Sequence, residues 1–113
     1  MANRKKWLIA VLLVFGSVVL YADRAFDPII SDYRREVQNL ENLVNRIIQS
    51  GRITNDNVRT LNDIAAKLNE LAARFNNRNL GTPTEQQQRQ LNDLEQRGQS
   101  AVNRLWNSGL TPP

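Results

Sequence analysis

Residues 7–22 form an uninterrupted apolar stretch, WLIAVLLVFGSVVLYA, of sixteen residues without a charge. Basic residues precede it directly, and Asp23 and Arg24 follow it. A chain of 113 residues has too little core to surround such a helix on every side, because small proteins bury a smaller share of their surface. The stretch therefore predicts a segment that enters a membrane or is recognised during export.

Two interpretations of this stretch remain open. A cleaved signal peptide has a basic start, an apolar core of about 7–15 residues and small residues before the cut. A cut after Ala22 would place the bulky Leu20 at the third position before it. A retained anchor needs roughly 17–25 apolar residues, which the stretch approaches if it continues to Ala25. We predict a transmembrane anchor over residues 7–25, with release by cleavage after Ala22 as the alternative.

Aromatic residues at both ends of the predicted anchor favour the retained form. Trp7 and Tyr21 lie where the helix would cross the membrane–water interface, a position that such rings prefer. The residues expected to contact membrane lipid are Trp7, Leu8, Ile9, Val11, Leu12, Leu13, Val14, Phe15, Val18, Val19, Leu20 and Tyr21.

The basic residues around the predicted anchor indicate its orientation. Arg4, Lys5 and Lys6 precede the anchor, whereas only Arg24 lies close behind it. Because Lys and Arg near the ends of a span tend to stay in the cytoplasm, residues 1–6 are expected to be cytoplasmic. The rest of the chain would then lie beyond the inner (cytoplasmic) membrane, in the periplasm or outside the cell.

The composition argues against an enzyme, a metal site and a nucleic-acid binder. The chain contains neither Cys nor His, so it lacks the usual thiolate and imidazole groups of nucleophilic catalysis and metal binding. Its net charge is +4, of which residues 4–6 supply three, and the remaining 12 basic and 11 acidic residues are interleaved. A DNA binder instead gathers its basic residues on one face. We therefore expect no enzymatic activity, no cofactor, no metal and no nucleic-acid partner.

A heptad pattern of apolar residues predicts a helix beyond the anchor. Asp27 followed by Pro28 is typical of an N-cap and a first helical position, and Gly51 is typical of the residue after a helix end. These signals predict a helix over about 28–50 and a break between it and the anchor. Its apolar seam has alternating spacings of three and four and comprises Ile30, Tyr33, Val37, Leu40, Val44 and Ile47.

Two further amphipathic helices are predicted from their own start signals. Thr54 is a natural N-cap, and the apolar face after it predicts a helix over about 54–76. Thr82 and Glu85 have the spacing of a capping box. They predict a third helix over about 83–107.

Three amphipathic helices joined by short loops favour antiparallel packing. The predicted fold is therefore all-α, with a single N-terminal transmembrane helix, a small three-helix antiparallel bundle over residues 26–109 and a tail over 110–113. The alternative is a longer helix that continues from the span and assembles as a coiled coil. The residues expected in the core of the bundle include Leu40, Val44, Leu61, Leu68 and Leu94.

A partner interface is expected where the three helices cover one another incompletely. The first two helices have wide apolar faces, whereas the third offers Gly98 and Ala101 in place of large residues. We expect the uncovered strip to receive another chain, with Trp106 as a candidate anchor. The candidate interface residues are Leu43, Ile48, Ile64, Leu71 and Trp106.

These observations lead to a hypothesis of function that involves no chemistry. We expect a non-enzymatic, single-pass membrane-anchored protein that acts as a structural or adaptor subunit of a bacterial envelope or phage membrane assembly through helix–helix contacts. Its expected partners are membrane lipid and other protein subunits, with self-association as one form. The alternatives are a phage inner-membrane spanin-like lysis protein, which shares this layout, and a secreted helical binding protein released after Ala22.

Overall fold

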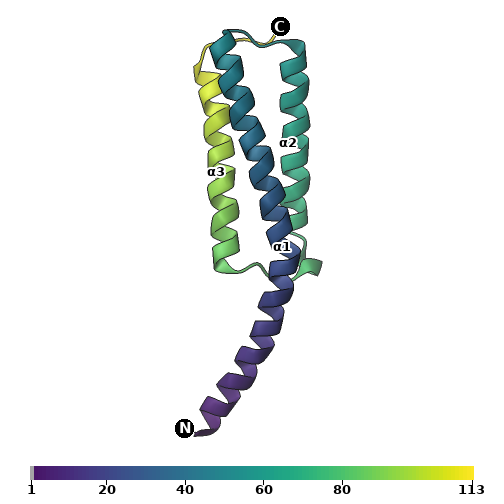
Figure 1. Cartoon of the computed structure of the whole chain (residues 1–113), viewed down its shortest axis with the longest axis vertical. Helices are drawn as coiled ribbons and strands as arrows, with labels where there is room; N and C mark the ends of the chain where they lie inside the picture. The colour runs from purple at the N-terminus through teal and green to yellow at the C-terminus, as the bar shows by residue number, and fades with distance from the viewer. Residues whose placement is uncertain (1) are drawn as a thin grey trace.

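The computed structural model describes the backbone of residues 2–113 and the side chains of residues 25–77 and 79–113. The elements in chain order are α1 (Ala2–Ser50), α2 (Asn55–Phe75), a short 3-10 helix η1 (Arg78–Leu80) and α3 (Glu85–Asn107) (Figure 1). Over the described backbone these helices are the only regular elements, and there is no strand. The prediction of an all-α fold with three helices in a bundle is therefore confirmed.

The central helix of the bundle is α1. Figure 1 shows α2 and α3 on opposite sides of α1. α2 runs antiparallel to α1, and α3 runs parallel to α1. Both α2 and α3 pack extensively against α1, whereas their own backbones approach each other closely almost nowhere. The arrangement is thus a bundle in which α1 packs against both other helices, while α2 and α3 contact each other little.

The start of the first bundle helix differs from the prediction. Pro28 lies inside α1, which is continuous through Asp27, so no break separates the bundle from the preceding residues. The local signal is overridden because Phe26 and Ile29 are buried in the core and hold this turn helical. The Asp27 carboxylate does not cap the helix but accepts a hydrogen bond from Gln87 Nε2 at 3.0 Å. The predicted start at residue 28 was therefore wrong.

The end of α1 and the start of α2 agree with the local signals in the sequence. Gly51 follows α1 with φ of +76°, a left-handed conformation that glycine adopts without the steric cost of a side chain. The backbone N–H of Asn57 donates to Thr54 Oγ1 at 3.1 Å, which makes Thr54 the N-cap of α2. These two residues confirm the predicted boundary.

The start of α3 is displaced by two residues from the prediction. The N-cap is Thr84, not Thr82, and the third helical residue is Gln87 rather than Glu85. The Gln87 N–H donates to Thr84 Oγ1 at 3.0 Å, and Gln87 Oε1 accepts from Thr84 N at 2.9 Å, which completes a capping box. Gln87 is only 3% exposed, and its bond to Asp27 ties this cap to α1. A tertiary contact therefore selects between two sequence-compatible caps.

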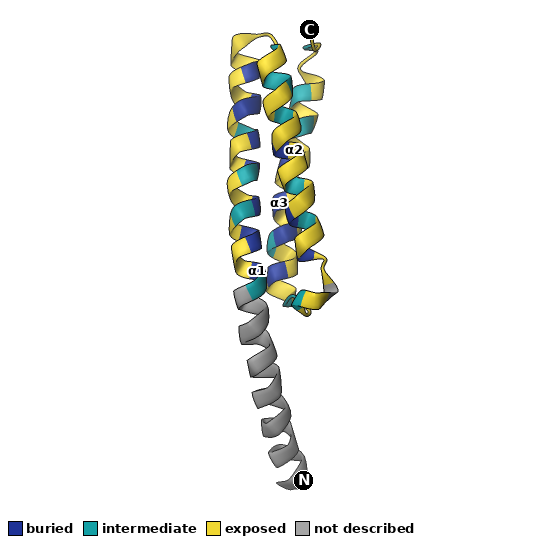
Figure 2. Ribbon diagram, turned by 90° about the vertical axis from the view of Figure 1, so that its right-hand side faces the viewer, coloured by how far each residue is buried: buried dark blue, intermediate teal, exposed yellow. Residues whose placement is uncertain are grey.

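Two apolar clusters form the core, and α1 contributes to both. Figure 2 shows buried residues recurring along the part of α1 that lies in the bundle. The first cluster is centred on Phe26 and Phe75, whose ring centroids are 5.0 Å apart. The second surrounds Val44 and Ile47 near the α1–α2 loop. Leu40, Val44 and Leu94 are buried as predicted, whereas Leu61 and Leu68 are only half-buried.

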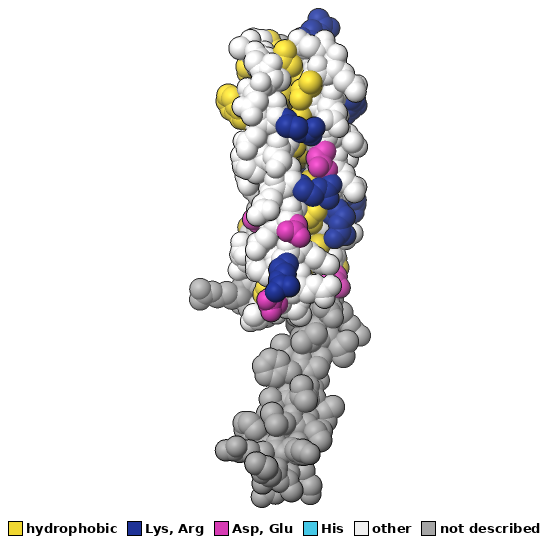
Figure 3. Space-filling view, turned by 90° about the vertical axis from the view of Figure 1, so that its left-hand side faces the viewer, with side chains coloured by type: hydrophobic (Ala, Val, Ile, Leu, Met, Phe, Trp, Pro, Cys, Tyr) yellow, Lys and Arg dark blue, Asp and Glu magenta, His cyan; other side chains and the backbone are white. Residues whose placement is uncertain are grey.

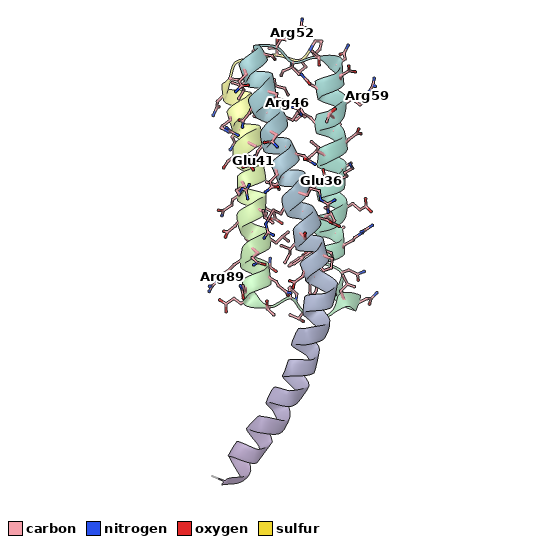
Figure 4. The ribbon with its side chains drawn as sticks, viewed as in Figure 1. Glu36, Glu41, Arg46, Arg52, Arg59 and Arg89 are labelled. Atoms are coloured by element: carbon pink, nitrogen blue, oxygen red, sulfur yellow. The ribbon has the colours of Figure 1, made fainter. Side chains whose placement is uncertain are left out.

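Polar contacts join α1 to α3 outside this core. Arg97 pairs with Glu41, and Arg104 Nη1 donates to Asn45 Oδ1 at 3.0 Å. Glu41 lies on the α3 side of α1 (Figure 4). Figure 3 shows acidic and basic side chains mixed on the face around α3. Such exposed pairs add little stability individually, so we attribute the docking of α3 mainly to its apolar face.

The predicted membrane anchor lies almost entirely outside the residues whose side chains the structure describes. Among the described residues, no helix is long and apolar enough to cross a membrane. The anchor over residues 7–25, its orienting residues 4–6 and the cleavage position after Ala22 lie outside the described side chains except for Ala25. They therefore stay predictions.

Candidate interaction groove

The separation of α2 from α3 leaves a groove along one side of the bundle. Its volume is about 610 Å³, and its floor is formed by α1 through Tyr33 and Leu40. We call this feature the α2–α3 groove. It is where α3 would cover α2 if the three helices were packed in a closed triangle.

The walls of the α2–α3 groove are mainly apolar side chains. From α2 and the loop before it come Ile53, Val58, Leu61, Ala65 and Leu68, and from α3 come Gly98, Val102, Leu105 and Trp106. Leu61, Leu68, Val102 and Leu105 pack partly against the core but keep part of their surface open. The half-burial of the two leucines on α2 follows from this opening.

The charged residues of α2 lie on its far side. At about 100° per residue, the groove-lining residues of α2 and its charged residues occupy arcs whose centres are about 160° apart. The only polar residues that α2 contributes to the groove are Asn62 and Asn69. The charged residues on the opposite arc are Asp56, Arg59, Asp63, Lys67, Glu70 and Arg74.

Glu95 on α3 is the one charged residue that lines the groove among the described side chains. It lies near Tyr33, which forms part of the floor. Burial raises the pKa of the Tyr33 hydroxyl above its ordinary value, and the negative charge of Glu95 raises this pKa further. The groove therefore combines a mainly apolar lining with the carboxylate of Glu95, which lies close to the buried hydroxyl of Tyr33.

An exposed aromatic side chain marks the opposite end of the groove. Trp106 is 78% exposed, and Leu110 and Pro112 of the C-terminal tail line the same end. Large exposed aromatic side chains are enriched at protein interfaces, where they contribute much of the binding energy. The sequence analysis named Trp106 as an exposed residue that could bind a partner, and the structure places it at the groove.

The other candidate interface residues are distributed differently from the expectation. Leu43, Ile64 and Leu71 are buried in the monomer, so the expectation that they line an uncovered strip was wrong. The physical reason is that the strip beside them is covered by the direct packing of α1 on α2. Ile48 is 38% exposed and does not line the groove. The contact of these four residues with a partner stays a prediction.

The sequence predicted an uncovered strip but placed it beside other residues than those that line the groove, although one signal for the groove was present. The apolar face of α2 is wider than a single neighbouring helix requires, and Ala65 and Leu68 belong to its extra width. Sequence periodicity does not show which side of a wide face is left uncovered. The spacing between α2 and α3 decides this, and it is a property of the packed bundle.

The described residues contain no arrangement that suggests catalysis. No group of acidic side chains among them could hold a metal ion. Asp32 is paired with Arg35 at 2.6 Å. Glu36 lies on the α2 side of α1 (Figure 4), and its Oε2 is buried without a hydrogen-bond partner.

Comparisons with models of protein families, with curated proteins and with solved structures give no match for this chain.

Proposed function

We propose that the chain is a membrane-anchored structural or adaptor subunit whose helical bundle binds another protein through the α2–α3 groove. The groove is the observation that carries this proposal, because its lining is largely apolar, whereas the face around α3 carries mixed charges (Figure 3). The apolar stretch over residues 7–22 supports the membrane anchor, and we propose that the bundle lies outside the cytoplasm. No catalytic step is part of the proposal.

The length of the groove matches about three turns of an α-helix. Between Leu68 and Val58, which both line it, α2 rises by about 15 Å, or roughly three turns. Four-helix bundles place apolar residues of each helix against two neighbours. A helix bound between α2 and α3 would complete such an arrangement, and binding of an amphipathic helix in an apolar groove is a common mode of recognition.

The predicted anchor would favour such an association. A partner in the same membrane is already confined near the bundle, so its effective concentration is high and part of the entropic cost of association is removed. A modest groove can then support a stable assembly. This reasoning also explains how a chain without disulfides could rely on assembly for additional stability.

The first experiment compares two neighbouring alanines on α2. Ala65 and Ala66 are both exposed, but only Ala65 lines the groove. In membranes of the source cells, Ala65→Arg should abolish co-purification of the partner with the full-length chain, because it puts a charge into the apolar opening. Ala66→Arg should leave co-purification intact. Circular dichroism should show the same helix content for both variants.

Two results would refute the proposal. The first is a full-length chain that purifies alone and monomeric from its own membranes. The second is an assembly that tolerates Ala65→Arg as well as Ala66→Arg. A reporter fused after Pro113 tests the orientation separately, because it should be active only outside the cytoplasm.

A further inference from the structure

Glu95 lines the α2–α3 groove without a neighbouring Lys or Arg to pair with, and this indicates the chemistry of the molecule that binds there. Glu95 has no Lys or Arg three or four positions away in the sequence, whereas every other acidic residue of α2 and α3 has one. Residues at these spacings are neighbours on a helix surface. Among the described residues Glu95 forms no ion pair. Its charge is therefore available to a bound molecule.

The distribution of charges disfavours a second copy of this chain as the occupant. A two-fold dimer uses the same surface on both subunits, so groove-to-groove packing would bring Glu95 from both copies into one apolar interface. Among the residues whose side chains the structure describes, no Lys or Arg lines the groove, so neither copy would neutralise the other's Glu95 from this surface. Like charges at such an interface oppose association.

We propose that the groove binds an amphipathic helix of a different protein, and that a Lys or Arg on this helix pairs with Glu95. This inference rests on the proposed function and specifies the partner. The apolar face of the bound helix would contact Leu61, Leu68 and Val102, and its uncharged flanks would meet Asn62 and Gln99, which line the groove.

The groove also fixes the position of the basic residue along the bound helix. Glu95 lies near one end with Tyr33, and Trp106 lies near the other end with Leu110. These two α3 residues are separated by about 16 Å along the helix axis. The partner helix should therefore carry its basic residue about three turns away from the large apolar residue that contacts Trp106.

The test is photo-crosslinking from two adjacent exposed positions of α3 in the full-length chain. A photo-reactive amino acid replaces Gln99, which lines the groove, or Ser100, which does not. In membranes of the source cells, Gln99 should crosslink to a helix of another protein that has a Lys or Arg about one turn from the crosslinked position. Ser100 should not crosslink to that helix.

The charge at Glu95 is then varied. Glu95→Gln keeps the shape of the side chain and should reduce the crosslinking yield roughly tenfold, because a charge-assisted hydrogen bond is lost. Glu95→Lys should abolish crosslinking, and replacing the partner's basic residue with Glu should restore it. Glu95 is exposed, so both variants should retain the helix content of the unmodified chain.

The outcomes separate this inference from the proposed function. Crosslinks from Gln99 to a second copy of the chain, or a yield unchanged by both Glu95 substitutions, would overturn the charge-paired helix but leave an adaptor function standing. If neither Gln99 nor Ser100 crosslinks to any protein and the chain purifies alone, the adaptor function fails as well.

Discussion

Replacement of Gly98 by alanine should stabilise the bundle. Gly98 is a buried residue in the middle of α3, and a Cβ atom built on it would lie 3.8 Å from Val37 Cγ2 and 3.9 Å from Leu40 Cδ2. Both distances are ordinary van der Waals contacts, so no rearrangement is needed. Alanine gains about 1 kcal/mol over glycine in a helix interior, and a buried methyl group adds up to about 0.8 kcal/mol. We expect the free energy of unfolding to rise by about 1–2 kcal/mol.

The same substitution at Gly51 is the matched control. Gly51 has φ of +76°, and a Cβ atom added there would meet nothing within 4 Å. Alanine at this position gains no contact and is forced into the left-handed region, at a cost of roughly 1–2 kcal/mol. The two Gly→Ala changes should therefore act in opposite directions. This contrast separates backbone strain from packing.

Thermal unfolding of the full-length chain in detergent, followed by circular dichroism at 222 nm (the usual α-helix band), measures both effects. For a domain of this size each kcal/mol shifts the midpoint by about 4–8 °C. Gly98→Ala should raise the midpoint, and Gly51→Ala should lower it. A lower midpoint for Gly98→Ala would refute the reasoning, because it would mean that α3 approaches α1 too closely to accept a methyl group.

Further predictions concern other parts of the bundle. Leu94→Ala should lower the free energy of unfolding by about 2–5 kcal/mol, as is usual for a buried leucine, and half-buried Leu68 should cost less when changed in the same way; equal losses in chemical denaturation would show that the groove is closed. Pro28→Ala should stabilise α1 by up to about 3 kcal/mol, and unchanged helix content and melting would show that the proline is not strained there. The pKa of Tyr33 is raised in the folded chain, so the folded state holds this proton more tightly than the unfolded state, and stability should fall as pH rises above about 10. Tyr33→Phe should weaken this fall in alkaline denaturation curves, and identical curves would contradict it.

Local signals were sufficient to predict the boundary between α1 and α2. Thr54 and Gly51 act within a few residues of themselves, and each requires a backbone conformation that few other residue types favour. Apolar periodicity likewise predicted helices that are buried on one face, and residues such as Val44 and Leu94 are in the core as expected. These features depend on short stretches of chain, which the sequence shows directly.

The two boundaries that were predicted wrongly depend on contacts between distant residues. Asp27 and Gln87 are 60 positions apart and share a hydrogen bond, which uses Asp27 away from a helix cap and anchors the capping box at Gln87 rather than Glu85. Each local alternative was chemically sound. The choice between them is made by this contact between α1 and α3 and by the burial of Phe26 and Ile29 in the core, which no local pattern contains.

The candidate site was less predictable than the fold for the same reason. An exposed aromatic at Trp106 could be proposed from one helix. The groove beside it depends on the distance between α2 and α3. This distance is set by how the side chains of each of these helices pack against α1. The significance of Glu95 also becomes visible only when its lack of a basic neighbour is combined with its position in the groove.

The central position of α1 has a consequence for the order in which the bundle assembles. The α1–α2 pair is joined by a short loop, whereas the contacts that attach α3 to α1 span 56 to 60 positions of sequence. Closing a longer stretch of chain costs more entropy before its contacts form, so we expect α3 to dock last and to detach first. Both walls of the groove exist only after this last step. A partner that needs both walls would therefore recognise only completely folded copies of the chain and would leave incomplete ones out of the assembly.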